Sequence, residues 1–570
     1  MAKPQAPASA RSRVGARRAA RRWLVQASAA LVAMSLAQAQ ADDTSATDKL
    51  RILYSSRFTF TDDGLPLVTV EIVSGVAEAK ISAKGGLVVR PDGVGGSAVE
   101  VPAGAAGQWT VRAEGTRPAL LQEWTVVETL SPDDARGITA ALARWKERGF
   151  EPRTFEIGTM FGVDGELIDT RDVRVCVDPV AAGKGAARAA ELATRFGVAT
   201  SVHQELVRRP AGTIVAESGG VVVRNPSVLW FTARRTSETV TVADVPTGTG
   251  GSQLETGKAD RRYWGSVYVT LAHDGKLVVA NALPENKLLE GLVPSEIFPE
   301  SPDAALEAQA IAARTELLQK IGRRNLTDPF LLCSTQQCQV YAGAGQEHPR
   351  TSRAVAATRG LVLLRDGGGL VDVRYSASCG GHSEHNEHVW GGEPDPSLRG
   401  HADAPKARQS RMDEAAVADF LQHPPEDAWC ARAKGGASRF RWTQTVSAEE
   451  LTRRVAAAHP QVGRVLALTP SDRGASGRAR QLTIRGDRGS AEVTGELVIR
   501  RLLGGLKSSL FTVEVQGPRK APAAFVFHGG GFGHGVGMCQ MGAIGMAEAG
   551  KHRGQILSHY FLGTKVHKLY

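Results

Sequence analysis

One glutamate of this sequence combines the chemistry of a proton donor with apolar neighbours. Glu296 is flanked by Val293, Pro294, Ile297 and Phe298. An apolar setting disfavours the ionised form of a carboxyl group, so Glu296 could hold a proton for a leaving oxygen near neutral pH. The residues alone leave an ordinary loop or capping carboxylate as the alternative.

Two cysteines that lie close together in the chain form a second candidate site. Cys333 and Cys338 are five positions apart. Such a pair could close a disulfide or supply two thiolates to a structural zinc ion. Two ligands do not make a zinc site, and an oxidising compartment favours disulfides. Both readings therefore stay open.

A run of three histidines follows a predicted strand and a glycine pair. His382, His385 and His388 are spaced by three residues, but the run lacks the His-Glu-x-x-His pattern of zinc peptidases. Tyr375 and Ser378 precede the run, where a glycine-containing loop can approach a ligand closely. We expect a solvated or sugar-contacting surface here, with a zinc amidase or peptidase as the alternative.

A glycine-rich stretch at residues 527–547 contains His534 and Gln540. Its glycines match neither the spacing of dinucleotide-binding loops nor a phosphate-binding loop with its lysine. Dense glycine lets a backbone lie close to another segment or to a sugar. A tightly packed turn before a helix is the alternative.

A predicted helix follows Glu296 and should help to position it. Ser301 as the N-cap and Pro302 at the first helical position predict a helix that extends to Gly322. The apolar residues that recur on one face of this helix are Leu306, Ala310, Ala313, Leu317 and Ile321. We expect that face to pack on the core. Gln309 and Arg314 then fall on other faces, available to a groove.

The whole chain predicts an α+β, β-rich protein of several domains. Residues 48–118 contain short β-branched runs between glycine turns, which indicates a small β-rich module. Residues 119–245 contain two β-α-β repeats that resemble the SPOR domains, which bind bare glycan strands; a spacer without a ligand is the alternative. The turn-rich residues 246–262 predict a linker, and residues 263–570 carry all of the chemical motifs.

Residues 1–41 have the pattern of a secretory signal peptide. They contain seven basic residues and no acidic one, then an apolar run and the small-residue sequence Ala39-Gln40-Ala41. This leader accounts for most of the formal net charge of +10, so the remaining chain is only mildly basic and does not predict nucleic-acid binding. We expect export to the periplasm or cell wall, with no membrane span beyond the leader.

Taken together and in this order, the motifs resemble the SpoIID/LytB family of stage II sporulation protein D and amidase-enhancer relatives. The resemblance covers roughly residues 265–570. It rests on the stretches Leu-Val-Pro-Ser-Glu, Ala-Ala-Arg-Thr, Cys-Gln-Val-Tyr, Tyr-Ser-Ala-Ser-Cys-Gly-Gly-His and Gly-Phe-Gly-His-Gly-Val-Gly-Met-Cys-Gln-Met-Gly. Ile297 and Cys539 depart from the methionine and serine that are common in the family.

The resemblance implies a SpoIID-like catalytic domain with peptidoglycan lytic transglycosylase activity. It implies that Glu296 is the catalytic acid, with Arg314 and Tyr375 in the active site. The residues expected to contact the substrate are Ser378, His382, His534 and Gln540. No cofactor is required, although a structural zinc ion has been associated with some members near the stretch that matches Cys333 and Cys338.

One carboxyl group suffices for the reaction that the resemblance implies. Glu296 would protonate the oxygen between N-acetylmuramic acid and N-acetylglucosamine. It would then accept the proton of the muramic C6 hydroxyl, which attacks the anomeric carbon and leaves a 1,6-anhydro end. The expected partners are peptidoglycan glycan strands and an N-acetylmuramoyl-L-alanine amidase. The alternative function is a non-catalytic wall-binding protein that enhances such an amidase.

Overall fold

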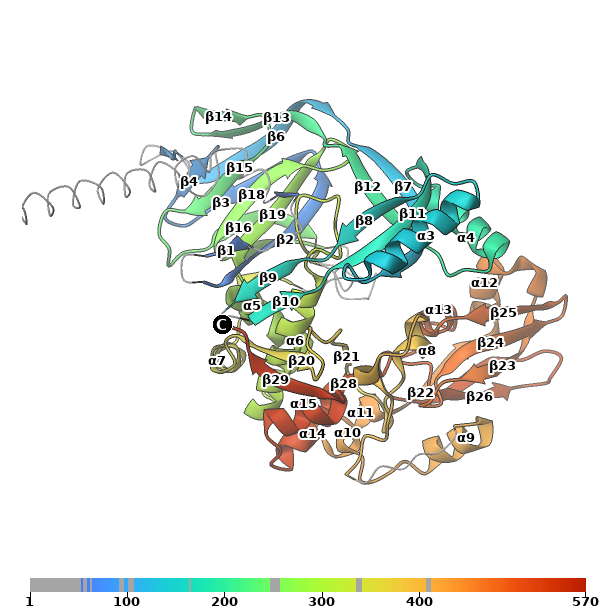
Figure 1. The fold of residues 1–570 in the computed structure, drawn as a ribbon. Coiled ribbons are helices and arrows are strands. Elements are labelled where there is room, and N and C mark those ends of the chain that lie inside the picture. The colour runs from blue at the N-terminus through green and yellow to red at the C-terminus, as the bar shows by residue number, and fades with distance from the viewer. Residues whose placement is uncertain are drawn as a thin grey trace, which may run out of the picture.

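The computed structural model describes most of the chain after the leader (Figure 1). The described residues are 53–54, 59–61, 64–91, 97–100, 107–163, 166–246, 257–334, 341–405 and 412–570. The expected signal peptide at 1–41 lies outside them, as does most of the expected linker at 246–262. The fold is a mixed α+β arrangement in which strands dominate, as predicted. Within the described residues, every helix is too short or too polar to cross a lipid bilayer.

Two antiparallel sheets form a β-sandwich with one shared hydrophobic core. The first sheet has the strand order β1-β2-β19-β18-β15-β4-β5. In that order the strands are Thr59–Phe60, Pro66–Val76, Leu277–Pro284, Ser266–Leu271, Leu229–Ala233, Leu87–Arg90 and Val99–Glu100. The second sheet has the order β14-β13-β6-β3-β16-β17. Its strands are Val221–Asn225, Ala211–Ser218, Gln108–Arg117, Glu78–Ser82, Val240–Pro246 and Lys258–Tyr263. Trp109 of the second sheet packs edge-on against Phe231 of the first, with ring centroids 6.3 Å apart.

The sandwich differs from the expected division of the chain in two respects. β18 and β19 follow residues 246–262 in sequence, yet they pair inside the first sheet, with β19 next to β2. Residues 211–246 supply strands β13 to β16 of the sandwich and are not part of a β-α-β unit. Pairing between strands that are distant in sequence leaves no mark in the local residue pattern, so a turn-rich stretch looked like a domain boundary.

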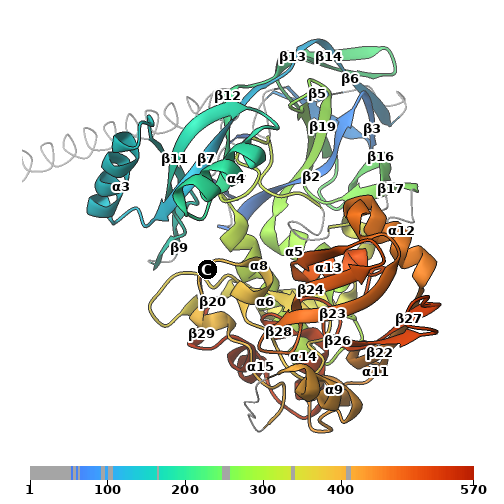
Figure 2. The same ribbon diagram turned by 90° about the vertical axis from the view of Figure 1, so that its right-hand side faces the viewer.

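A four-stranded lobe interrupts the sandwich between β6 and β13 (Figure 2). Its main elements are β7 (Leu120–Leu130), α3 (Ala135–Glu147), β8 (Arg153–Ile157), β11 (Asp172–Ala181), α4 (Gly185–Phe196) and β12 (Ser201–Arg208). A hairpin of β9 (Met160–Val163) and β10 (Glu166–Asp169) lies between β8 and β11. Trp145 of α3 and Leu192 of α4 share one core on the sheet. The two expected β-α-β units are therefore present, in the order of a ferredoxin-like fold. Glycan binding by this lobe stays a prediction.

The region that carries Glu296 is built from two separated stretches of chain, which we call the helical region. The first stretch supplies α5 (Glu285–Glu296), α6 (Asp303–Lys320), α7 (Pro349–Ala357), β20 (Leu361–Arg365) and β21 (Tyr375–Ser376). The second supplies β28 (Met538–Cys539), α14 (Gln540–Glu548), α15 (Arg553–Tyr560) and β29 (Thr564–Lys568). β20 pairs antiparallel with β29, and β21 pairs parallel with β28. The chain thus leaves the helical region after β21 and returns to it at β28.

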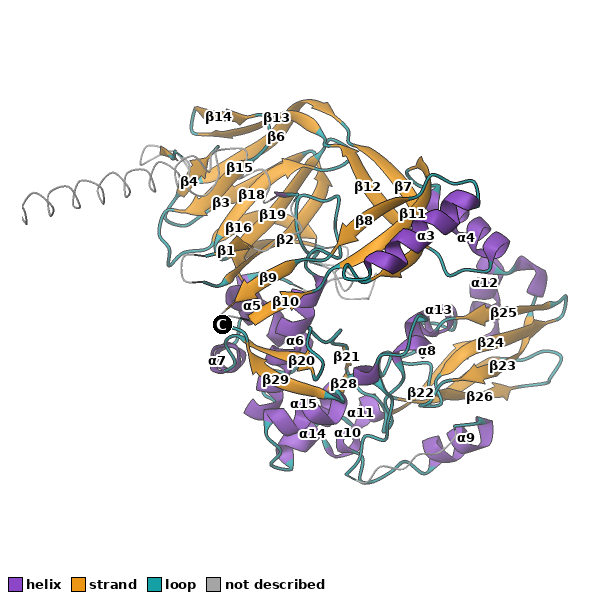
Figure 3. Cartoon of the chain, viewed as in Figure 1, coloured by secondary structure: helices purple, strands orange, loops and turns teal. Residues whose placement is uncertain are grey.

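Most of the residues between these two stretches form a further lobe, which we call the insertion (residues 386–530; Figure 3). It contains two three-stranded sheets, β22-β27-β26 and β23-β24-β25. The strands from β22 to β27 are Arg441–Ser447, Val465–Arg473, Ala479–Gly486, Ser490–Thr494, Phe511–Gln516 and Ala524–Gly530. The helices from α8 to α13 are Asn386–Trp390, Glu414–Gln422, Trp429–Arg432, Ala437–Phe440, Ala448–Ala458 and Glu496–Leu502.

The helix α6 is covered on all sides. It begins directly after Pro302, close to the predicted start, and 14 of its 18 residues are buried. The expected apolar stripe faces the core, but the side chains of Gln309 and Arg314 are also fully buried. The expectation that Arg314 is available to a groove is therefore wrong. The reason is that α5, α7, α14, α15 and β20 all pack against this helix.

A buried ion pair joins α6 to α5. Nε of Arg314 lies 3.3 Å from both carboxylate oxygens of Glu285, and both side chains are fully buried. Nη1 of Arg314 donates to the carbonyl oxygens of Thr358 (2.7 Å) and Leu361 (3.2 Å). The hydroxyl of Tyr570 donates to Glu285. A charge inside a protein is tolerated only with partners of this kind, so the pair is part of the core.

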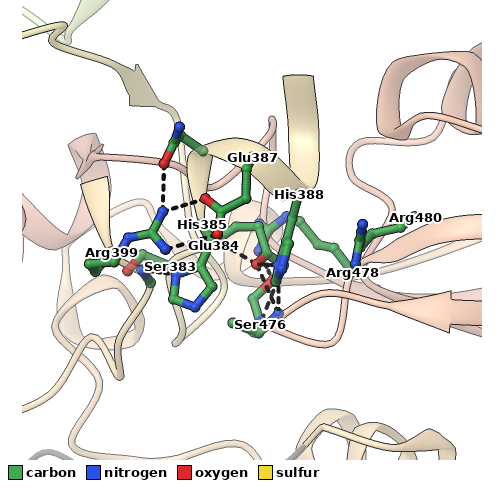
Figure 4. A network of polar contacts seen from close by, with 12 residues as sticks. Ser383, Glu384, His385, Glu387, His388, Arg399, Ser476, Arg478 and Arg480 are labelled. Carbon is green, nitrogen blue, oxygen red and sulfur yellow. Dashed lines mark hydrogen bonds and ion pairs between the residues drawn. The ribbon is translucent and has the colours of Figure 1, made fainter. Parts of the chain in front are cut away.

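The buried carboxylate of Glu384 joins the loop after β21 to the insertion (Figure 4). It accepts hydrogen bonds from the hydroxyl of Ser476 (2.6 Å) and the backbone N–H of Ala475 (2.9 Å), and it contacts Nδ1 of His388 (2.9 Å). Burial alone would raise the pKa of Glu384. The hydrogen bonds from His388 and Ser476 and the charge of Arg478 outweigh burial and lower this pKa to about 2. The carboxylate is therefore ionised at neutral pH.

Replacing Arg314 by methionine should destabilise the protein strongly, because Glu285 would keep a buried charge without its partner. We expect the free energy of unfolding to fall by about 3–5 kcal/mol, measured by urea denaturation. The double variant Arg314→Met with Glu285→Leu should recover part of this loss, since no buried charge remains. An Arg314→Met variant as stable as the wild type would contradict the structural role of the pair.

The lowered pKa of Glu384 predicts a stability contribution that disappears in acid. A carboxylate with a depressed pKa stabilises the folded state above its ordinary pKa of 4.5, and this contribution is lost as the pH falls toward about 2. The wild type should exceed Glu384→Gln in free energy of unfolding by about 3 kcal/mol at pH 7 and by almost nothing at the acid limit. Urea denaturation of both proteins across this pH range measures the difference. A difference that does not change with pH would refute the assignment.

Candidate active site

A pocket of about 230 Å³ opens beside Glu296. Its lining residues are Pro294, Ser295, Glu296, Ile297, Phe298, Ala377, Arg439, Gln540, Met541 and Ile544. Glu296 is the last residue of α5 and is half-buried. The backbone N–H of Ile297 closes this helix by donating to the carbonyl oxygen of Val293 (3.1 Å). The apolar stretch around Glu296 is thus a helix end, which the residue pattern does not predict because Pro294 argues against a helix.

Gln540 holds the backbone at Glu296. Its Nε2 donates to the carbonyl oxygen of Glu296 (2.7 Å) and to Oε1 of Gln309 (3.2 Å). Gln540 begins α14, directly after β28 has paired with β21. The returning stretch of chain therefore fixes the position of the glutamate.

The insertion contributes a cation to the same pocket. Arg439 belongs to α11, and its guanidinium carbon lies 4.4 Å from the ring centroid of Phe298. Phe298 is itself 46% exposed. A cation over an aromatic face is attracted by the ring, which orients Arg439 beside the pocket. Arg439 has no motif in the sequence, so only the fold reveals it.

Among the described residues that line this pocket, Glu296 has the only carboxyl group. Ile297, Met541 and Ile544 make part of the lining apolar. Such a site can donate a proton to a bound group and take one back. It offers no second carboxylate at the pocket to act as a nucleophile or to activate water.

Tyr375 and Ser378 lie on either side of Ala377, which lines the pocket. Tyr375 pairs with Met538 between β21 and β28 and is half-buried. Ser378 is fully buried, and its backbone exchanges two hydrogen bonds with Phe532 (3.0 and 2.8 Å). Neither residue belongs to the lining, so their roles at a substrate stay predictions.

His534 lies in the glycine-rich loop before β28. Its Nδ1 accepts a hydrogen bond from the backbone N–H of Val536 (3.0 Å), and its ring packs edge-on against Trp390 with centroids 4.9 Å apart. Burial, helped by the charge of Arg374, lowers the pKa of His534 to about 3, so the ring is neutral at pH 7. His534 does not line the Glu296 pocket, and its contact with a sugar stays a prediction.

The histidine run lines a second cavity of about 760 Å³, whose other lining residues belong to the insertion. Nδ1 of His382 contacts the carbonyl oxygen of Ser383 (2.7 Å), and Nδ1 of His385 accepts a hydrogen bond from the backbone N–H of Gly400 (2.8 Å). His388 contacts the buried carboxylate of Glu384, as Figure 4 shows. Within the described chain, these rings do not belong to a group of converging metal ligands. The arrangement gives the zinc peptidase alternative no support.

Two further predicted site residues, Arg314 and Cys333, do not line the Glu296 pocket. Arg314 is absent from the pocket lining because Glu285 and backbone carbonyls engage its guanidinium in the core. Cys333 is disulfide-bonded, and a sulfur in a disulfide is not available as a thiolate ligand. Cys338 lies outside the described residues. Of the two alternatives for Cys333, the disulfide is therefore confirmed and zinc binding is not.

Two family models match the chain. The family model of the stage II sporulation protein (SpoIID) matches residues 273–364, which include α5, α6 and Glu296. A domain of unknown function (DUF8618) matches residues 384–537, which include the insertion. The matched segments thus correspond to the first stretch of the helical region and to the lobe that interrupts it.

Curated proteins of similar sequence cover about half of this chain. An uncharacterised protein of Brachyspira hyodysenteriae is 28% identical over 304 residues, which are 53% of this chain and 72% of that protein. Stage II sporulation protein D of Bacillus amyloliquefaciens is 26% identical over 301 residues, 50% of this chain and 74% of that protein. The amidase enhancer of Bacillus subtilis is 26% identical over 299 residues, 48% of this chain but only 40% of that protein. Together with the SpoIID match, these relatives support the assignment of the chain to the SpoIID/LytB family.

Proposed function

We propose that this chain is an exported peptidoglycan lytic transglycosylase with Glu296 as its general acid and base. The relatives support a role at the cell wall. The observation that carries the finer proposal is the pocket in which, among the described lining residues, only Glu296 has a carboxyl group. Glycoside hydrolases generally use two carboxylates. In transglycosylation, a hydroxyl group of the substrate takes the place of the second carboxylate.

The proposed reaction uses the carboxyl group of Glu296 twice. Glu296 first protonates the oxygen that links carbon 1 of N-acetylmuramic acid to carbon 4 of N-acetylglucosamine, and the bond from carbon 1 to this oxygen breaks. The carboxylate then takes the proton of the C6 hydroxyl of the same muramic residue as that oxygen bonds to carbon 1. The products are a 1,6-anhydro end and a free hydroxyl on N-acetylglucosamine, and Glu296 is again an acid.

The surroundings of Glu296 suit this reaction. The apolar side chains of Ile297, Met541 and Ile544 limit the access of water to the sugar, so the C6 hydroxyl has less competition as the nucleophile. Gln540 holds the backbone of the acid, which keeps its geometry fixed. Arg439 would bind carboxylates of the wall, such as those of the muramic lactyl groups.

Enhancement of an amidase without catalysis is a second candidate function. The relative from Bacillus subtilis that is named an amidase enhancer favours it. In this case the chain would bind glycan strands and stimulate an N-acetylmuramoyl-L-alanine amidase, and the pocket would be a binding site. A pure binder releases no anhydro sugars, so product release separates the two functions.

The Glu296→Gln variant should lose the release of anhydro-ended sugars from purified sacculi. Its side-chain amide has nearly the same shape but cannot act as the acid. General acid–base catalysis contributes roughly 10²–10⁴-fold, and we expect the rate to fall by about that factor. Mass spectrometry of soluble products from peptide-bearing and amidase-stripped peptidoglycan measures the loss.

Glu300→Gln is the matched control for this experiment. Glu300 is a nearby carboxylate whose side chain is 79% exposed, and it does not line the pocket. This control should release sugars at the wild-type rate. If the wild type and both variants bind sacculi but release no sugar, the amidase enhancer replaces the transglycosylase. Equal release by Glu296→Gln and the wild type would remove Glu296 from the mechanism.

Arg439→Ala should weaken substrate binding more than it slows the chemistry. A hydrogen bond to a charged group contributes about 1.5–3 kcal/mol, so we expect KM to rise by roughly tenfold or more with little change in kcat. Steady-state release from amidase-stripped glycan measures both constants. Arg439→Lys keeps the charge and should recover part of the loss. Arg432→Ala removes an exposed arginine of α10 as a control. A lower kcat with an unchanged KM would argue against a binding role for Arg439.

A further inference from the structure

Three cysteines and one aspartate meet inside the protein. Cys379, Asp403, Cys430 and Cys539 are fully buried, and their ligand atoms all lie within 4.8 Å of one another. We call these four residues the cysteine cluster. Cys379 follows β21 and Cys539 ends β28, whereas Asp403 and Cys430 belong to the insertion. Four segments that are far apart in sequence therefore converge at one point.

Two distances within the cysteine cluster are close to the edges of a tetrahedral zinc site. Sγ of Cys379 lies 3.6 Å from Sγ of Cys430 and 3.3 Å from Oδ2 of Asp403. Zn–S bonds of about 2.3 Å and Zn–O bonds of about 2.1 Å give tetrahedral edges of about 3.8 Å between two sulfurs and about 3.6 Å between sulfur and oxygen. The two observed distances are shorter than these edges by about 0.2 and 0.3 Å, and the remaining pairs lie within 4.8 Å.

Neighbouring groups orient the ligand atoms of the cluster. Sγ of Cys539 accepts hydrogen bonds from the backbone N–H groups of Cys379 (3.1 Å) and Gly542 (3.2 Å). The hydroxyl of Tyr560 donates to Oδ1 of Asp403 (2.7 Å), which leaves Oδ2 beside the sulfurs. A Cβ atom on Gly542 would lie only 2.8 Å from the Asp403 carboxylate, so the glycine allows this close approach. Outer hydrogen bonds of this kind hold the ligands of metal sites.

We propose that the cysteine cluster binds one structural zinc ion. Nε2 of His559 and the Tyr560 hydroxyl contact Oδ1 of Asp403, whereas Oδ2 faces the three thiol groups, so one divalent cation there would serve all four residues. Four protein ligands complete a tetrahedral shell, so the ion has a structural role and no open position for a substrate. This inference does not depend on the proposed transglycosylase activity.

The zinc ion would fasten the insertion to the helical region next to the Glu296 pocket. Cys539 directly precedes Gln540, which holds the backbone of Glu296. Cys430 lies in α10, the helix before the one that carries Arg439. Binding at the cluster therefore stabilises two walls of the pocket, one from each part of the chain.

A disulfide between Cys379 and Cys430 is the competing arrangement in an exported protein. Their sulfur atoms are 3.6 Å apart, whereas a disulfide bond is about 2.05 Å long. A disulfide would also use only two of the three thiols and would leave the Cys539 thiol and Oδ2 of Asp403 out of the bond. Zinc binding uses all four groups, and we therefore prefer it.

Metal analysis of the exported chain, purified without chelator, tests the proposal. We expect one zinc ion per chain, and replacement by Co²⁺ should give the absorption bands of tetrahedral thiolate coordination. Cys430→Ser should lose the zinc. Cys176→Ser and Cys333→Ser should keep it, because Cys176 is a buried free cysteine in another lobe and Cys333 is disulfide-bonded.

Thiol titration in denaturant with a chelator separates zinc from a disulfide. With zinc, Cys430→Ser has one thiol fewer than the wild type. With a disulfide, the same change frees Cys379 and adds one thiol. If Cys430→Ser does not fold, the zinc content of the wild type still decides the matter. A wild type without zinc, zinc that survives Cys430→Ser, or zinc that is lost in Cys333→Ser would each overturn the proposal.

Discussion

Beyond its first turn the helix α6 is almost entirely buried, so Gln309 and Arg314 find their partners inside the protein. Arg314 bonds to Glu285 of α5 and to carbonyl oxygens before β20 and at its start. Gln309 bonds to Gln540 at the start of α14, and Gln540 in turn holds the carbonyl of Glu296. The contacts that allow α6 to be buried therefore also place the end of α5 against α14. Stability of the core and geometry of the pocket have the same physical origin.

The pocket is complete only when distant parts of the chain have come together. Glu296 and Phe298 come from the first stretch of the helical region, Gln540 and Met541 from the second, and Arg439 from the insertion. Short pairings between β20 and β29 and between β21 and β28 hold the two stretches together. The proposed zinc ion would add a further link at the place where the insertion leaves and the chain returns.

The local sequence pattern predicts those features of the fold and the site that depend on residues adjacent in the chain. The Ser301-Pro302 signal places the start of α6 to within about two residues, and the apolar neighbours single out Glu296. The burial of Arg314 could not be predicted, because helical spacing says which residues share a face but not what covers that face. Arg439 and Cys430 carry no local signal, since their neighbours in space come from other segments. The same limit explains why strands on both sides of residues 246–262 join one sheet.

In the proposed reaction, one carboxyl group suffices because the substrate supplies its own nucleophile. Digestion of purified peptidoglycan in water enriched in oxygen-18 tests the source of the nucleophile most directly, with the new glycan ends analysed by mass spectrometry. A transglycosylase incorporates no oxygen from water, so the account predicts 1,6-anhydro ends without the heavy isotope. Reducing ends that carry oxygen-18 would show that water is the nucleophile and would contradict the account.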